Sequence, residues 1–473
     1  MKKLTVHFVF LMIVLAYGCK KDTVFYTGNN VKLVFQFWPG RPADTVFFDT
    51  VFTRMSGTQY PRSVNKQFFI VNRLNQPVKT NILLAGGSNS SYRINVDGVS
   101  STDFKEVEIP AKDSLIAFVE VTLEANNQIN PAILTDSILF NTNGQQQKII
   151  LAAYGWDAIY FHDSVISQNM VWSQTDKPYV IVNSILVNTN TTLQILQGVN
   201  VYSSPGSSIY VAGTLSVEGD ELQPVIFQGD RLQPGFEEVP GQWQGIHLLK
   251  ESKDTRIKNS IIKNATIGVR VDSLSNNSSP KLHISKTLIK NCSFYGLIGI
   301  TAPIFAENIA IARCGANGFV GYFGGDYTLR HCTFASGFLG GRTQSACVLN
   351  NIQRDDKDRF VRSYPISYKI ENCIIYGPLE DEFIIDIHSG TPPLFALIDH
   401  CLIRTKEYAK ALNINNNILN TDPLLIAPRD SDLGLRPGSP VIGKAKTLNP
   451  QVFIDLKGNT RKNPADIGAY EVE

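Results

Sequence analysis

Six side chains in the second half of the chain could together recognise a sugar polymer. Along a β-strand, successive side chains point to opposite faces, so in the segment 268–272 Val269 and Val271 face inward while Arg270 and Asp272 face outward. Applied to the related segments, this alternation gives the outward set His247, Arg270, Asp272, Tyr322, Asp386 and His388. These residue types offer hydrogen-bond donors, acceptors and an aromatic ring, which suits a sugar-binding groove. The other interpretation is an ordinary solvated face, because a half-exposed strand carries outward polar residues in any case.

Two local patterns bear on catalysis. Arg256-Ile-Lys258 is similar to a tripeptide of pectin-hydrolysing enzymes, but there it follows a paired Asp motif and a Gly-His-Gly, and this sequence has no Gly-His-Gly. Asp355-Asp356 resembles the paired carboxylates of glycoside hydrolysis. It lies in the charge-rich run 354–359, which has no β pattern and predicts a solvated loop. We therefore assign no catalytic residue.

Metal and cofactor sites are not indicated either. Of the seven cysteines, five fall inside a repeated phrase and Cys347 lies outside it, while Cys19 stands near the N-terminus. No paired Cys or His spacing typical of a metal site occurs, so neither a metal nor a cofactor is expected. Disulfides are one interpretation in an exported protein. Small, readily buried thiols stacked in a core are the interpretation that the repeat favours.

The segments that must position these residues repeat one short phrase. It has an apolar residue, a polar residue, a small or thiol residue and a further apolar run, often followed by Gly. Equivalent positions are Ser260, Thr287, Ile309, Cys332, Cys373 and Cys401, separated by steps of 27, 22, 23, 41 and 28 residues. A period in the twenties made of short β-type runs predicts a solenoid in which each repeat stacks on its neighbours. The long step predicts an insertion around 342–364 that forms an external loop or lid.

This repeat resembles the right-handed parallel β-helix of the pectate-lyase-like superfamily. The resemblance rests on turn residues beside apolar ones, Asn259, Asn264, Asn291 and Asn372, and on the starts Gly245-Ile246, Gly268-Val269, Gly296-Leu297 and Gly318-Phe319. Asn tolerates the left-handed conformation that tight corners need. The predicted fold class is all-β, with a β-helix over 159–421 of about ten coils.

A different pattern precedes the repeat. Between 31 and 158, short β-branched and aromatic segments recur at about ten-residue spacing with turns between them, as at Gly86-Gly87-Ser88 and Asn143-Gly144. This predicts an antiparallel β-sandwich, and the region is similar to the immunoglobulin-like module at the front of many surface lipoproteins. Trp38 and Trp156 are expected to be core or edge aromatics of it.

The last residues, 422–473, form another distinct segment. Asp455-Leu-Lys-Gly-Asn-Thr-Arg461 and Asp466-Ile-Gly-Ala-Tyr-Glu471 resemble the closing segment of many bacterial β-helix proteins. We expect this segment to cover the exposed end of the solenoid, because repeat proteins need such caps.

The N-terminus predicts export. Lys2 and Lys3 precede an apolar run, and Gly18-Cys19 follows, which indicates a signal peptide over 1–19. Cys19 in this position resembles the lipidation site of a bacterial lipoprotein, with a tether over 20–30. Ordinary signal cleavage with an incidental Cys19 is the alternative. The lipoprotein resemblance implies an outer-membrane location, with Cys19 anchored in lipid.

Charge and composition limit the remaining function classes. Lys plus Arg number 44 against 42 Asp plus Glu, without a basic patch, so nucleic acid is not an expected partner. The sequence predicts a lipid-anchored envelope or surface protein whose β-helix binds a polysaccharide or a cell-surface protein partner without catalysis. The alternatives are a polysaccharide lyase or glycoside hydrolase with a diverged site, and a purely structural spacer.

Overall fold

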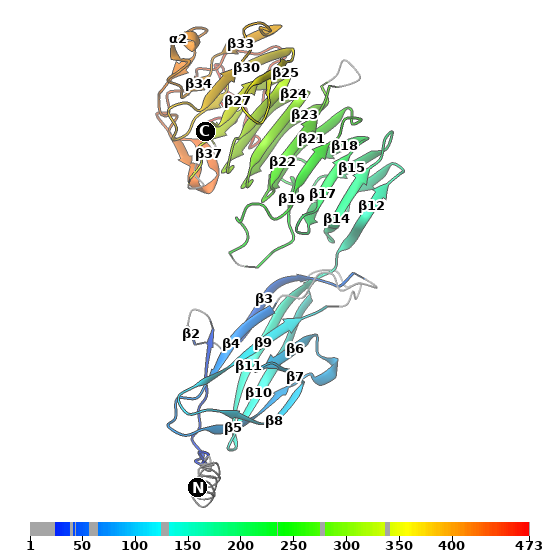
Figure 1. Ribbon diagram of the computed structural model, residues 1–473, viewed down its shortest axis with the longest axis vertical. Helices are drawn as coiled ribbons and strands as arrows, with labels where there is room; N and C mark the ends of the chain where they lie inside the picture. Colours follow the sequence, from blue (N-terminus) through cyan, green and yellow to red (C-terminus); the bar gives the residue numbers. More distant parts are fainter. Residues whose placement is uncertain are drawn as a thin grey trace, which may run out of the picture. The chain divides into compact units, whose positions relative to one another are not determined.

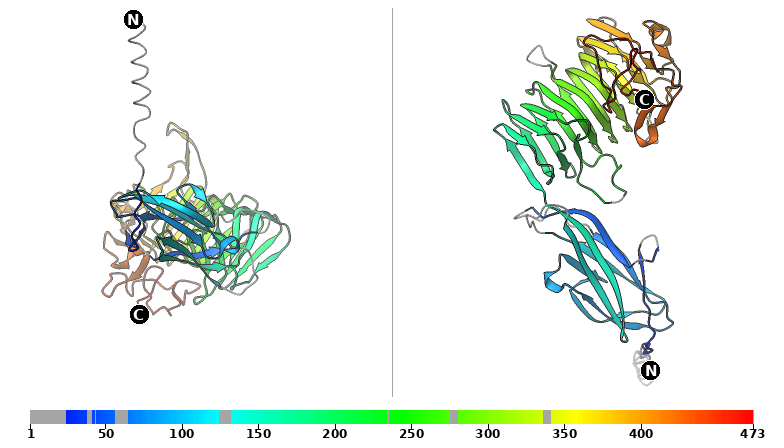
Figure 2. Two further views of the ribbon diagram at one scale, coloured as in Figure 1. Left: turned by 90° about the horizontal axis from the view of Figure 1, so that it is seen from below. Right: turned by 180° about the vertical axis from the view of Figure 1, so that it is seen from behind.

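The computed structural model describes residues 24–37, 41–42, 44–55, 65–123, 132–233, 235–274, 280–335 and 341–472. The predicted signal peptide 1–19, its Cys19, part of the tether and Trp38 lie outside the described residues. The chain divides between Asp157 and Ala158 into two compact units. Strands dominate both units (Figures 1 and 2), so the chain is all-β as the sequence predicts.

The first unit is a β-sandwich. Its two sheets have the strand orders β2-β1-β4-β9-β6-β7 and β3-β11-β10-β5-β8 (Figure 1). The strands are β1 (Val34–Phe37), β2 (Arg41–Pro42), β3 (Thr45–Phe52), β4 (Asn65–Val71), β5 (Val78–Leu84), β6 (Tyr92–Val96), β7 (Val99–Ser100), β8 (Asp103–Ile109), β9 (Ser114–Val121), β10 (Ala132–Thr142) and β11 (Gln145–Trp156). Inward residues of both sheets, among them Phe48, Phe68, Ile82 and Phe140, form one buried cluster.

One pair of this sandwich departs from the predicted antiparallel arrangement. β3 runs parallel to β11, with Val46 beside Leu151 and Phe52 beside Trp156. Trp156 is half-buried at this edge, and its ring lies 6.1 Å from that of Phe52. The alternation that predicts strands carries no information about which strand pairs with which, so the parallel pair could not be expected from it.

The second unit is a parallel β-helix. In its described part, 22 strands join into one network of parallel pairs. They are β12 (Ile159–Ile166), β13 (Met170–Trp172), β14 (Tyr179–Val187), β15 (Thr192–Leu196), β16 (Asn200–Ser203), β17 (Ser208–Val211), β18 (Thr214–Glu218), β19 (Val225–Gly229), β20 (Gly245–Leu248), β21 (Thr255–Lys263), β22 (Ile267–Asp272), β23 (Leu282–Lys290), β24 (Tyr295–Ala312), β25 (Phe319–Arg330), β26 (Thr333–Ala335), β27 (Cys347–Asn350), β30 (Ile366–Glu371), β31 (Ile374–Ile375), β32 (Phe383–Asp386), β33 (Phe395–Asp399), β34 (Leu402–Ile403) and β35 (Ile418–Leu419).

These strands make three ladders, which we call sheets A, B and C. Sheet A passes through β17, β20, β22, the start of β24, the start of β25, β27 and β32. Sheet B passes through β18, the starts of β21 and β23, the middle of β24, the end of β25, β30 and β33. Sheet C passes through β19, the ends of β21, β23 and β24, then β26, β31 and β34. The successive strands are stacked side by side in Figure 1.

The register of sheet C confirms the equivalence predicted from the repeat. Ser260 lies beside Thr287 and Thr287 beside Ile309, while Thr333 lies beside Ile374, so Cys332 and Cys373 occupy successive coils. The six cysteines of this unit are buried free thiols. Cys347 also belongs to a coil, because it lies between Phe319 and Phe383 in sheet A.

The corners of the coils explain the repeated Asn and Gly residues. Asn259, Asn264, Asn291 and Asn372 all have positive φ, between 47° and 63°. Gly245 has a φ of +117°, and a Cβ there would lie 1.6 Å from the carbonyl oxygen of Ile267 in the next coil. Only glycine therefore allows the backbone of adjacent coils to approach this closely.

The insertion is more ordered than the sequence suggests. Around the predicted solvated run, β28 (Ile352–Arg354) and β29 (Phe360–Ser363) pair as an antiparallel hairpin. Asp355 occupies its turn, where one carboxylate oxygen accepts hydrogen bonds from the backbone N–H groups of Lys357 and Arg359. The charge-rich run 354–359 is thus mostly an exposed turn, as predicted, and the two short strands that flank it are the feature that the sequence did not indicate.

The closing segment packs along a flank of the coils, a position that the sequence did not predict. After a short helix, α2 (Ala409–Leu412), it contains the hairpin β36 (Leu425–Ala427) and β37 (Asp432–Leu435). Its Leu433, Val441 and Ile467 pack against Ala310, Ala335, Ile374 and Leu402 on the outer face of sheet C. Small outward residues on that face let the segment lie close, and this contact between distant parts of the chain leaves no local pattern.

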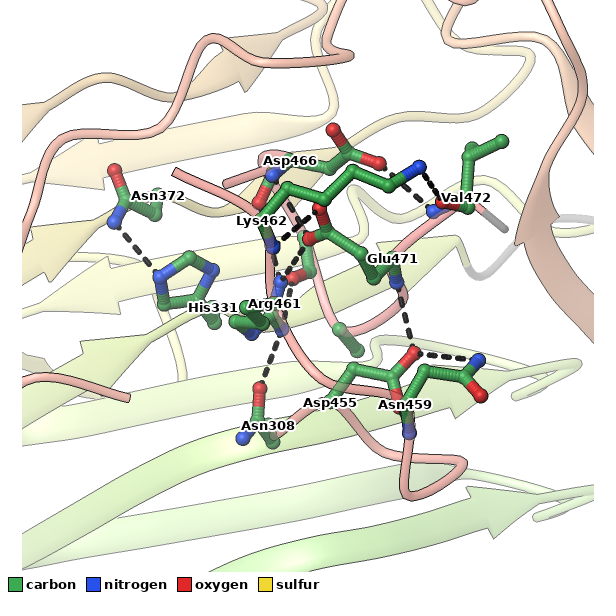
Figure 3. Close-up of polar contacts among 12 residues, drawn as sticks. Asn308, His331, Asn372, Asp455, Asn459, Arg461, Lys462, Asp466, Glu471 and Val472 are labelled. Carbon is green, nitrogen blue, oxygen red and sulfur yellow. Dashed lines mark hydrogen bonds and ion pairs between the residues drawn. The ribbon is translucent and has the colours of Figure 1, made fainter. Parts of the chain in front are cut away.

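Buried polar contacts fix the segment there (Figure 3). The Arg461 guanidinium donates to the side-chain oxygen of Asn308 at 2.6 Å and pairs with Glu471. Asn372 donates to the carbonyl oxygen of Lys446 and contacts the Nε2 atom of His331. Of the charged residues in the two closing motifs, Arg461 therefore bonds the coils directly, and Glu471 pairs with Arg461.

Candidate functional site

Sheet A is the element that positions most of the predicted site residues. Its inward row is Ile246, Val269, Leu297, Phe319, Cys347 and Phe383, all buried and stacked from coil to coil. The neighbouring residues must then face outward. His247 and Arg270 are successive members of one outward row. Asp272 lies beside Ile300, which lies beside Tyr322, and Asn350 lies beside Asp386, so these residues follow a second row.

The structure brings three of the predicted residues together. Asp272 Oδ2 lies 2.7 Å from His247 Nε2, and Asp272 Oδ1 accepts a hydrogen bond from Arg270 Nε at 2.9 Å. Burial alone would raise the pKa of the Asp272 carboxyl, but the hydrogen bonds from His247 and Arg270 outweigh it and hold that pKa below its usual value. This charged cluster keeps Asp272 ionised.

Asp386 and His388 lie in a second cluster with residues that the sequence did not single out. Asp386 accepts hydrogen bonds from Asn350 at 2.8 Å and from Arg354 at 3.0 Å. The ring of His388 stacks on Phe360 with 4.4 Å between centroids. Arg354 and Phe360 come from the β28–β29 hairpin, so the insertion contributes directly to this cluster.

Tyr322 belongs to a third group, which we call the aromatic strip: Phe294, Tyr295, Tyr322, Phe323 and Tyr364. Consecutive ring centroids in this order are 4.3, 6.4, 5.8 and 6.0 Å apart. The outward residues Ile298 of β24 and Val320 of β25, which lie side by side on this face, are buried. Burial, with Tyr322 nearby, raises the pKa of Tyr295, so its phenol stays neutral and can donate a hydrogen bond.

Sequence reasoning missed most of this strip for identifiable reasons. Tyr295 stands immediately before the Gly of its repeat, so the alternation that starts at that Gly does not include it. Phe323 has a φ of 57°, a conformation that bulky residues rarely adopt, so the corner that turns its ring could not be inferred. Tyr364 follows Phe360-Val-Arg-Ser363, in which apolar and polar residues do not alternate, so no periodic signal marked this strand of the hairpin.

The spacing of the carboxylates limits the chemistry. Asp272 and Asp386 lie four strands apart on sheet A, which at about 4.8 Å per strand is a separation of roughly 19 Å. Glycosidases place their two carboxylates about 5–9.5 Å apart. These two residues therefore cannot act on one glycosidic bond.

The other catalytic patterns remain separate from sheet A. Arg256 and Lys258 are exposed residues of sheet B, where Arg256 lies beside Ser216 and His283. Asp355 is held by its hairpin turn and by Arg359. Within the described ranges, no group of three or more His, Cys, Asp or Glu side chains is arranged to hold a metal ion.

Comparisons with known proteins assign the chain to no family. No protein-family model matches it, and no curated protein matches it. Among solved structures, a family 123 glycoside hydrolase from Clostridium perfringens is 11% identical with a TM-score of 0.19, over 28% of this chain and 26% of that one. The catalytic unit of a thermostable GH87 alpha-1,3-glucanase from Streptomyces thermodiastaticus strain HF3-3 is 12% identical with a TM-score of 0.30, over 68% of each chain. This chain thus spans about a quarter of the first enzyme, and both likenesses are too weak to say what it binds or does.

Proposed function

We propose that the second unit binds an extended polysaccharide along the outer face of sheet A and does not cleave it. The observation that carries the proposal is the aromatic strip, which joins coils of the β-helix between the His247–Asp272–Arg270 cluster and the Asp386–Arg354 cluster. Rings offer apolar area to the faces of sugars, and the flanking clusters offer donors and acceptors to their hydroxyl groups. Because the strands repeat regularly, the surface suits a polymer better than a small molecule.

A second candidate is a polysaccharide lyase, favoured by the contact of His247 with Asp272 and Arg270. A lyase needs a base to take a proton and a cation to neutralise a uronate. Here Arg270 is already paired with Asp272. Lys281, whose pKa burial lowers to about 8, is fully buried and donates to the carbonyl oxygen of Lys250, so it cannot reach a substrate. These contacts favour binding over turnover at the cluster.

Binding and turnover can be measured on the same samples. The exported chain would be incubated with neutral and acidic polysaccharides, and both retention on the insoluble or immobilised polymer and new reducing or unsaturated ends would be followed. We expect at least one polymer to bind without turnover, and Tyr322→Ala to weaken binding about tenfold. Tyr154→Ala is the matched control, since Tyr154 is a tyrosine that packs against an aromatic ring, that of Phe47, but lies in the sandwich.

Turnover that disappears in Asp272→Asn would replace the binding proposal with the lyase or hydrolase. Binding that is equally strong in wild type and Tyr322→Ala would remove the aromatic strip from the site. If no polymer binds and none is cleaved, the spacer function is the remaining class.

We propose further that the protein is exported and anchored by lipid at Cys19, in the outer membrane. The support is the sequence of residues 1–19, a basic start followed by a short apolar run and Gly18-Cys19. Within the described residues no helix has the length and apolar character needed to cross a membrane. Metabolic labelling with palmitate should label the wild type and not Cys19→Ala; label that persists in the variant would refute this anchor.

A further inference from the structure

The first unit has a hollow of about 580 Å³ on the outer face of its sheet β4-β9-β6-β7. Such a volume falls within the range of about 300–1,000 Å³ typical of ligand sites. The residues used below are Asn65, Arg93, Asn95, Ser100, Phe118 and Glu120, all of which line the hollow. None of them belongs to sheet A, so the hollow is independent of the proposed polysaccharide surface.

Strand register brings these side chains together on one face. Glu120 of β9 lies between Asn65 of β4 and Arg93 of β6. Two residues earlier, Phe118 lies beside Asn95, which lies beside Ser100 of β7. The intervening Val119 and Ile94 are buried in the sandwich core, so both rows point away from it.

The lining combines one aromatic ring with both hydrogen-bond donors and hydrogen-bond acceptors. Phe118 is half-buried in the middle of the sheet. Asn95 is held in place because its amide donates to Ser100 Oγ at 3.0 Å and its oxygen accepts from the Gly98 N–H at 3.0 Å. Arg93 and Glu120 are exposed neighbours on adjacent strands.

This lining can contact both the hydroxyl groups and the apolar ring face of a sugar. A hydroxyl group both donates and accepts hydrogen bonds, so adjacent hydroxyls can use the Arg93 guanidinium and the Glu120 carboxylate at once. The apolar face of the same ring can cover Phe118. A carboxylated sugar is less suitable, because Glu120 would repel it at the position where Arg93 would attract it.

We propose that this hollow is a binding site for a neutral oligosaccharide, distinct from the polysaccharide surface on sheet A. A chain with both sites would hold a glycan through each of its two units, and simultaneous binding would raise the overall affinity for a polymer that reaches both.

Calorimetric titration of the exported chain tests the site with defined probes: the hexasaccharides of cellulose, xylan, mannan and amylose, with hexagalacturonate as the acidic comparison. We expect one neutral hexasaccharide to bind, and both Phe118→Ala and Arg93→Met to weaken it at least tenfold. Phe47→Ala is the matched control, because Phe47 is an exposed phenylalanine on the other sheet of the same sandwich. Thermal unfolding of each variant verifies that the sandwich stays folded.

The outcomes separate this site from the proposed function. Tyr322→Ala should leave hexasaccharide binding at the hollow unchanged. Binding that is lost in Tyr322→Ala and retained in Phe118→Ala would assign the sugar to sheet A and overturn the proposal. It would also be overturned if none of the four neutral hexasaccharides binds, or if only hexagalacturonate does.

Discussion

Asp272 is the residue on which the electrostatics of the candidate surface depend. Its carboxylate is shared between an imidazole and a guanidinium, each within 2.9 Å of one of its oxygens. All three side chains keep some exposure to solvent, with 22% for His247, 39% for Arg270 and 21% for Asp272. Exposed ion pairs of this kind contribute little to stability, so the cluster is better understood as a fixed arrangement of donors and acceptors.

The first prediction concerns the pH dependence that Asp272 confers. Its pKa is lowered in the folded chain, so the unfolded chain takes up the proton first as the pH falls. The stabilisation is complete above the unfolded pKa of about 3.9 and is lost as the pH falls through the lower folded pKa. In urea unfolding, Asp272→Asn should therefore be less stable than wild type at pH 7, by up to about 1 kcal/mol.

The same comparison at pH 3 and below is the control. The difference between wild type and Asp272→Asn should shrink there, because Asp272 takes up its proton first in the unfolded chain and then, below its lowered pKa, in the folded chain as well. A difference that stays constant from pH 7 to pH 2.5 would show that the His247 and Arg270 contacts do not set the ionisation of Asp272.

For single residues, the sequence predicted which way a side chain points better than which residues it contacts. Alternation correctly placed Val269 and Val271 inside and left Arg270 and Asp272 partly exposed, because the inside and outside of a strand are a local property. It could not predict that Tyr322 would meet Tyr295 of the preceding coil, or that Asp386 would meet Arg354 of the hairpin. Those contacts depend on side-chain rotamers and on a hairpin absent from the other coils.

The corner between two strands is the element that makes the coil repeat. Asn259 shows how: its φ is 47°, and its side-chain amide donates to the carbonyl oxygen of Gly219 in the preceding coil at 2.9 Å. The residue thus satisfies a buried backbone acceptor while adopting a conformation that most side chains avoid.

The second prediction separates these two contributions. Asn259→Ala should destabilise the β-helix by about 2–3 kcal/mol, because it loses a buried hydrogen bond and forces Ala into the left-handed region. Asn259→Gly should cost less, since glycine adopts that conformation freely and only the hydrogen bond is lost. Chemical unfolding of wild type and the two variants measures the contributions of the hydrogen bond and of the backbone conformation. Equal stabilities for the Ala and Gly variants would mean that the left-handed conformation contributes nothing to the cost of replacing Asn259.

The closing segment is the element that the sequence predicted least well. Its motifs were recognised, but their position was not, because Arg461 reaches Asn308 across 153 residues of sequence. By contrast, the coils were predictable because each strand pairs with one about a single repeat away, as Ser260 does with Thr287. Local periodicity reports local stacking, whereas the docking of a non-repeating segment depends on the matching of two distant surfaces.

The third prediction is that Arg461→Met releases this segment. The Arg461 side chain is 1% exposed and Glu471 2%, so the variant leaves a buried carboxylate without its cation. A loss of about 3–5 kcal/mol is typical for breaking such a pair. Limited proteolysis should then cut the segment after Ala445 faster than in wild type, while Lys457→Met, which removes an exposed charge of the same segment, should behave like wild type. Unchanged protease resistance in Arg461→Met would contradict the anchoring role.

Across the whole molecule, two separate cores determine how the chain should unfold. The sandwich has its own buried cluster, with Phe68 and Phe140, and the β-helix has another, with Phe227 and Phe383, which no residue of the first unit joins in the described ranges. Cores that share no residues can lose their packing at different temperatures. Each coil of the β-helix also gains stability from stacking on the coils beside it, whereas the sandwich has no repeated unit to stack.

The last prediction is therefore that calorimetry resolves two unfolding transitions, and that single substitutions assign them. Asn259→Ala and Arg461→Met should lower only the transition of the β-helix, because both residues lie in the second unit. Phe68→Ala, which removes a fully buried ring from the sandwich, should lower only the other transition, at a cost of about 3–5 kcal/mol. If all three variants shifted both transitions by the same amount, the two units would be unfolding as one, and the hollow in the sandwich and the surface on sheet A could no longer be treated as independent sites.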